Sequence, residues 1–241
     1  MLILAIDTAT PAASVALVKD RVLLSESFYN LGKNHSLTIM PGIDHMLKNC
    51  ALTVQDLSAV AVSIGPGSFT GLRIALATAK GLCAAADLPL IAISTLDMLV
   101  YNVIGSPYLA GALLDARKNE VYMGLYSVAG HFPVPLTETG VCSPEQFAAS
   151  AQVIMNTNHT QHIILLGSGV DIYENIWNQF WGTNWITPPT HLLLPRASAL
   201  AYLAGIKYEA GEFEDLKKLS PCYIRLSEAE NKLRQGELLA E

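Results

Sequence analysis

The same short pattern opens each half of the chain. LILAIDTATPAASVALV (residues 2–18) and AGALLDARKNEVYMGLY (residues 110–126) each contain an apolar strand, an Asp near its end, a short polar turn and a second apolar strand. Asp7 coincides with Asp115 in this alignment. A strand–turn–strand unit that opens two successive halves indicates a duplicated α/β domain, although the few identical residues leave a chance likeness open.

The stretches around these two copies predict alternating strands and helices. Gly105 and Pro107 in YNVIGSPY mark a boundary before the second copy. This order predicts two domains, 1–104 and 105–241, with mixed sheets that are antiparallel at one edge and parallel beyond it. It leaves open whether the final segment packs back on the first domain. The expected strands are 22–29, 59–64, 90–94 and 163–169, and the expected helices are 36–49, 68–86, 96–103, 144–155 and 173–181.

The composition limits the classes of function. Only 15% of the residues are charged and 51% are hydrophobic, against roughly 25% charged in a typical soluble domain. Part of the surface is therefore meant for another protein, or the core is unusually large. The net charge of −6 disfavours a broad nucleic-acid surface. With four dispersed cysteines and neither a signal-peptide pattern nor a membrane span, we expect a cytoplasmic protein.

A glycine-rich stretch, VSIGPGSFTGLRIALATAKGL (residues 62–82), has the strand–turn–helix layout of a phosphate-binding loop. It lacks the Lys of a Walker A loop, and its glycines are spaced one residue too widely for a dinucleotide fingerprint. The N–H groups that open the helix would favour an anion, whereas a tight turn alone would also explain the glycines. The residues that an anion or nucleotide site would use are Asp7, Thr8, Gly65, Gly67, Ser68, Arg73 and Asp115.

The helix after this loop carries a stripe of small residues. Gly71, Ala75 and Ala79 lie four apart, with Thr78 beside them. Small side chains on one stripe let another helix approach closely. That second helix could belong to the same domain or to a partner.

The remaining side chains form no recognisable catalytic set. His35 and His45 are ten residues apart, which is not the i, i+4 spacing of a helical metal site, and no G-x-S-x-G motif occurs. We therefore predict no metal site and no catalytic residue. Trp177, Trp181 and Trp185 repeat every four residues, which indicates an aromatic cluster on one helix face, in a core or an interface.

Several stretches together resemble the bacterial TsaB family of tRNA threonylcarbamoyladenosine biosynthesis proteins, also called YeaZ or glycoprotease-like. They are LAIDTATPAASVAL, NHSLTIMPGIDHML, GPGSFTGLRIALATAKGL, DARKNEVY and PCYIR. GPGSFTGLR is highly specific. The resemblance implies a two-lobed actin-like ATPase (ASKHA) fold in the α/β class, made of two ribonuclease-H-like lobes with mixed sheets flanked by helices.

The resemblance also implies a non-catalytic paralogue of TsaD, the subunit that transfers threonylcarbamoyl to N6 of adenosine 37 in tRNAs reading ANN codons. TsaD carries an H-x-x-x-H metal pair, whereas here Ile39 stands where the second histidine would follow His35. The implied partners are TsaD and TsaE, with a homodimer when the chain is alone and tRNA contacted only through the complex. The implied interface residues are His35, Ile39, Ile43, Met46, Leu47, Thr70, Gly71, Leu72, Ala75, Leu76, Thr78 and Ala79.

Three functions follow as hypotheses. The first is a scaffold that supports TsaD, with no cofactor of its own and with a nucleotide at the TsaD junction left open. The second is an enzyme, either a weak actin-like ATPase or a metalloprotease. In actin-like ATPases a glycine stands two residues after the strand-end Asp; Ala9 and Arg117 occupy that place here, which weakens the case for hydrolysis. The third, direct RNA binding, is disfavoured by charge.

Overall fold

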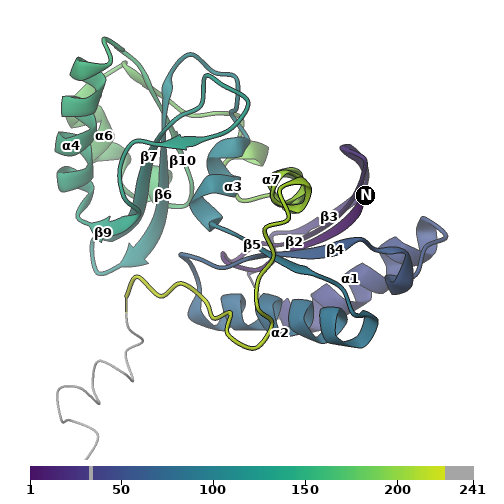
Figure 1. Cartoon of the computed structure of the whole chain (residues 1–241). Coiled ribbons are helices and arrows are strands. Elements are labelled where there is room, and N and C mark those ends of the chain that lie inside the picture. Colours follow the sequence, from purple (N-terminus) through teal and green to yellow (C-terminus); the bar gives the residue numbers. More distant parts are fainter. Residues whose placement is uncertain (33–34, 226–241) are drawn as a thin grey trace, which may run out of the picture.

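The computed structural model describes residues 1–32 and 35–225 and divides the chain into two lobes, each built on one central sheet (Figure 1). The first sheet has the order β3-β2-β1-β4-β5. β2 pairs antiparallel with both β1 and β3, whereas β4 runs parallel to β1 and β5. The bounds are β1 (Leu2–Asp7), β2 (Ala13–Lys19), β3 (Val22–Tyr29), β4 (Ala59–Ser63) and β5 (Leu90–Ile93).

The second lobe repeats this arrangement. Its sheet has the order β11-β10-β6-β7-β8, with β9 also paired to β7, so the central antiparallel pair and the parallel neighbour recur. Its strands are β6 (Leu109–Arg117), β7 (Glu120–Ser127), β8 (Val134–Pro135), β9 (Gly140–Cys142), β10 (Ile163–Leu166) and β11 (Trp185–Ile186). The predicted duplication and the predicted two-lobed α/β architecture with mixed sheets are confirmed.

Helices cover one face of each sheet. In the first lobe these are α1 (His35–Asn49) and α2 (Phe69–Ala86), with a short 3-10 turn, η1 (Val54–Asp56), between α1 and β4. Asn34, which opens the NHSLTIMPGIDHML stretch, lies outside the described residues. In the second lobe α4 (Pro144–Thr157) and α6 (Glu174–Trp181) pack on the sheet, with α5 (Gly169–Ile172) preceding α6. Trp177 and Trp181 stack in this core, whereas Trp185 lies on β11 rather than on the helix.

The opposite faces of the two sheets are covered by helices exchanged between the halves of the chain. α3 (Thr95–Tyr101), capped by Ser94, packs Leu96, Leu99 and Val100 against β6, β7 and β10 of the second sheet. After the 3-10 turn η2 (Thr190–Leu192), α7 (Ala197–Glu209) packs against β1, β2, β4 and β5 of the first sheet. The two lobes are therefore joined through α3 and α7, which lie between them (Figure 1).

Two further observations concern the thiols and the helix lengths. Cys50, Cys83, Cys142 and Cys222 are all free, and Cys222 is the exposed one. Burial raises the pKa of the Cys83 thiol to about 11, because the thiolate would be desolvated in the first-lobe core. Across residues 1–32 and 35–225, no helix combines the length and the apolar character that a bilayer span requires.

Candidate functional site

The glycine-rich loop is packed directly against the turn that follows β1. The Ser68 N–H donates to the Ala9 carbonyl at 2.7 Å, and the Thr8 hydroxyl donates to the Gly71 carbonyl at 2.6 Å. A Cβ added at Gly67 would lie 2.3 Å from the Ala9 oxygen, and one at Gly71 would lie 1.9 Å from the Thr8 oxygen. These glycines are therefore required by close contact between two stretches of backbone, with Ser68 capping α2.

Asp7 lies beneath this loop, cut off from solvent. Its side chain is fully buried; Oδ1 accepts hydrogen bonds from the Ser63 hydroxyl and from the Ala9 N–H, at 3.1 Å for the latter. Oδ2 has no hydrogen-bond partner among the described residues. Burial raises the pKa of this carboxyl to about 6, although the two hydrogen bonds oppose the rise. Through these bonds the carboxyl ties the end of β1 to the end of β4 and to the β1–β2 turn.

A cleft of about 800 Å³ lies between the lobes. Its walls come from the β1–β2 turn, the start of α2, the β6–β7 turn and residues 222–225. Of the seven predicted anion-site residues, Gly67, Ser68 and Asp115 line this cleft. The others do not. Asp7 and Thr8 are buried under the loop, and Gly65 is buried within it. Arg73 lies on the outer side of α2.

The cleft also holds residues that the site prediction missed. Arg117 and Lys118 contribute positive charge from the β6–β7 turn, and Tyr223 and Arg225 line it from the C-terminal segment. The signal for them was present, because they lie in the DARKNEVY and PCYIR stretches. His35 borders the cleft as well, where its Nε2 lies 3.0 Å from the Thr10 carbonyl. Within the described ranges, no three His, Cys, Asp or Glu side chains gather closely enough to hold a metal ion.

Most of the residues predicted for the partner interface are buried inside the first lobe, which corrects that prediction. Ala75 and Ala79 are fully buried and face β1 and β4 of their own lobe, so the small-residue stripe cannot itself contact a partner. Thr78 is half-buried and Thr70 is exposed beside the cleft. The other residues predicted for the interface that also lie in the first-lobe interior are Ile39, Ile43, Met46, Leu47, Gly71, Leu72 and Leu76.

The outer side of the same helices carries exposed apolar and small residues beside polar ones such as Asp44, Lys48 and Arg73. On α1, Leu37 is 69% exposed, Met40 is 48% exposed and Pro41 is also exposed. On α2, Ala77 and Gly81 are exposed. We call these five residues the α1–α2 face. Both helices lie on the side of the first sheet away from α7 (Figure 1). An exposed apolar surface of this kind marks a protein contact more often than a ligand site.

Known proteins are similar to this chain in sequence and in fold. A family model described as TsaD, tRNA N6-adenosine threonylcarbamoyltransferase, matches residues 24–232. The tRNA threonylcarbamoyladenosine biosynthesis protein TsaB of Bacillus subtilis is 34% identical over 96% of this chain and 97% of its own length. Its counterpart in Escherichia coli is 29% identical over 97% and 98%.

A solved structure agrees with these sequence matches. YeaZ from Pseudomonas aeruginosa superposes with a TM-score of 0.76 at 27% identity, covering 92% of this chain and 99% of that one. The duplicated sheets with exchanged helices are those of the actin-like ATPase fold. Sequence and fold thus agree over nearly the whole length, and the chain belongs to the TsaB (YeaZ) family of tRNA threonylcarbamoyladenosine biosynthesis proteins.

Proposed function

We propose that this protein is a scaffold subunit of the machinery that adds threonylcarbamoyl to N6 of adenosine 37 in tRNAs reading ANN codons. It binds a TsaD-type transferase, works with TsaE, and contacts tRNA only through the complex. The names of its relatives support the pathway. A role without chemistry is supported by the burial of Asp7 and by Ile39, a core residue where the metal pair of TsaD would need a histidine.

The observation that carries the proposal is the α1–α2 face. Removing Leu37 and Met40 from water would stabilise a complex, because apolar area buried at an interface is worth roughly 25 cal/mol per Å² before the costs of association. On the neighbouring helix α2, the small residues Ala77 and Gly81 would allow a partner helix to approach closely. We propose that TsaD occupies this face and that a second copy of the chain occupies it when TsaD is absent.

The test is a single charge placed on this face. Ala77→Arg introduces a long cation at an exposed helix position, so the protein should stay folded while the complex with TsaD is lost on gel filtration. Ala149→Arg, at an exposed alanine of α4 in the second lobe, is the matched control and should co-elute with TsaD. If folded Ala77→Arg still co-elutes with TsaD, the α1–α2 face is not the contact.

Activity is tested by reconstitution. TsaD, TsaE, the adenylate-forming enzyme and tRNA are combined with the wild-type chain, with Ala77→Arg, or with neither, and the modified adenosine is quantified. We expect modification with the wild-type chain and little with the other two. Equal modification in all three reactions would contradict a scaffold role.

A weak ATPase is the second candidate, and the cleft favours it. Arg117, Lys118 and Ser68 line a space between the lobes that a nucleotide could enter in the isolated chain. The measurement is ATP turnover and metal content of the purified chain alone. Values at background would remove this candidate and leave the scaffold role standing.

A further inference from the structure

The last described segment of the chain crosses from the first lobe to the second. After α7, the Glu214 N–H donates to the Leu90 carbonyl at 2.9 Å, which places the segment beside β5. The described segment then runs past α2 and reaches the β6–β7 turn of the second lobe (Figure 1, yellow). We call residues 219–225 the strap. Cys222, Tyr223 and Arg225 of the strap line the cleft between the lobes.

The strap is held to the first lobe at three points. The Lys80 ammonium donates to the Leu219 carbonyl at 2.7 Å, and the Cys222 N–H donates to the Ile64 carbonyl at 2.7 Å. The Cys222 carbonyl lies so close to Gly65 that a Cβ there would be 2.8 Å from its oxygen. The glycine-rich loop is thus shaped to accept the strap as well as the β1–β2 turn.

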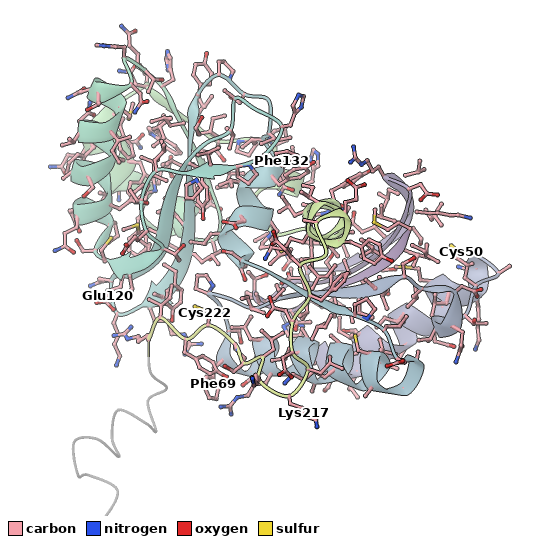
Figure 2. The ribbon with its side chains drawn as sticks, in the orientation of Figure 1. Cys50, Phe69, Glu120, Phe132, Lys217 and Cys222 are labelled. Atoms are coloured by element: carbon pink, nitrogen blue, oxygen red, sulfur yellow. The ribbon has the colours of Figure 1, made fainter. Side chains whose placement is uncertain are left out.

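Tyr223 supplies the third point. Its ring lies 4.9 Å from the Phe69 ring, and its hydroxyl accepts a hydrogen bond from Arg73 Nε at 2.9 Å. The Arg73 guanidinium lies 3.7 Å from the centre of the Phe69 ring, so the three side chains form one packed group at the start of α2. Figure 2 shows Phe69 close to the strap, and Cys222 on the strap itself.

Among residues 1–32 and 35–225, the side chain that attaches the strap to the second lobe is Arg225. Arg225 pairs with Glu120 at 2.9 Å and donates to the Ala116 carbonyl at 3.2 Å. Both members of the ion pair are about one-third exposed. The contacted turn is unusual, because Arg117, Lys118 and Asn119 all have positive φ. Glu120 lies at the end of the second lobe that faces the strap (Figure 2).

We propose that the strap is a latch across the mouth of the cleft, and that it opens by releasing Arg225 from the second lobe while staying bound to the first. The asymmetry follows from the contacts. Backbone hydrogen bonds and a packed aromatic group hold the first-lobe end, whereas in the described part of the chain one partly exposed arginine holds the other end. Because α3 and α7 join the lobes elsewhere, release at Glu120 frees the second lobe to move about them and widens the cleft.

The experiment measures the distance between the lobes in the full chain. Spin labels are attached through genetically encoded keto residues at Lys48 on α1 and Val153 on α4, both exposed, so that the native thiols do not interfere. Arg225→Ala and Glu120→Ala should each increase the population with a longer distance roughly fivefold, the change that a partly exposed ion pair supports. Arg225→Glu combined with Glu120→Arg should shift the distribution back toward that of the wild type, but not fully, because a carboxylate at position 225 cannot donate to the Ala116 carbonyl.

Two further measurements separate a latch from local unfolding. Lys218→Ala removes a neighbouring exposed cation that pairs with Asp215, away from the second lobe, and should leave the distance unchanged. In Arg225→Ala, hydrogen exchange at the Cys222 amide should stay slow, because its bond to Ile64 is retained. An unchanged distance in Arg225→Ala, an equal effect of Lys218→Ala, or rapid exchange at Cys222 would each overturn the proposal.

Discussion

Replacing Asp7 by Asn is expected to change how the stability of the protein depends on pH. The wild-type carboxyl is buried, and its pKa is raised from 3.8 to about 6. Between these values the folded state keeps the proton while the unfolded state loses it, so ionisation stabilises the unfolded chain. The free energy of unfolding contributed by Asp7 therefore falls as pH rises from about 4 to about 6 and is constant above that range.

The size of this effect follows from the rise in pKa. One pKa unit is worth about 1.4 kcal/mol, so ionised Asp7 costs the folded state about 3 kcal/mol at neutral pH. Asn carries no charge and avoids this cost. Its amide would, however, donate from the position of Oδ2, which has no partner among the described residues, at a cost of about 1 kcal/mol. We expect Asp7→Asn to be less stable than wild type below pH 4 and about 2 kcal/mol more stable at pH 7–8.

The assay is urea unfolding of both proteins at half-unit intervals from pH 4 to pH 8. Most other groups titrate alike in the two proteins, so the difference in unfolding free energy isolates residue 7. Ser63→Ala is the companion variant. It removes a hydrogen bond that favours the carboxylate, so the transition should move to higher pH. A difference between Asp7→Asn and wild type that is flat over this range, or that decreases with pH, would refute the reasoning.

Three more substitutions test the contacts that stabilise the fold. Gly71→Ala, whose Cβ would lie 1.9 Å from a backbone oxygen, should destabilise the protein by at least about 3 kcal/mol, whereas Gly81→Ala, which meets open space on the same helix, should stabilise it by roughly 0.5–1 kcal/mol; equal melting temperatures would contradict this. Glu26→Ala should cost about 3 kcal/mol in urea unfolding, because Glu26 pairs with Arg196 at 2.7 Å and accepts the Ser198 N–H at 3.0 Å; a loss below 1 kcal/mol would show that the pair is not important.

The main strands and the mixed parallel and antiparallel character of the sheets could be predicted from sequence because the determining signals are local. Apolar runs such as 2–6, 59–63 and 163–166 are long enough for strands and too short for helices. Turn residues separate them, and the repeated hairpin fixes the order of the central strands in both lobes. The periodic helices α1, α2, α4 and α6 were found for the same reason.

Helix α7 was missed because its signals are not local. ASALAYLAGIKYE is apolar around most of its circumference, since the helix is covered by the first sheet on one side and by α3 on another. It therefore lacks the polar face that reveals an amphipathic helix. Its start also lacks a local cap. Arg196 occupies the cap position without a capping side chain, and the first N–H groups are satisfied by Ser14 and Glu26, from strands at the far end of the sequence.

The small-residue stripe was misassigned because α2 has small residues on two sides. Ala75 and Ala79 face the sheet, whereas Ala77 and Gly81 face outward. The spacing of small residues along α2 cannot say which side of the helix faces the sheet, because that depends on how the helix is placed on the strands. The glycine-rich loop was ambiguous for a similar reason. The backbone segments that approach Gly65 and Gly71 belong to residues 222 and 8. The contacts that require these glycines therefore lie outside the glycine-rich stretch, far away in the sequence.

Because helices are exchanged between the lobes, the second half of the chain has a part in the proposed scaffold role. The α1–α2 face lies on helices that pack on one side of the first sheet, and the other side of that sheet is covered by α7, which belongs to the second half of the chain. Without α7, Ile3, Ala61 and Ile91 would be exposed to water, and the first sheet would lose half of its core. A chain that served only to present α1 and α2 would therefore still need the second half, because that half completes the sheet on which the two helices rest.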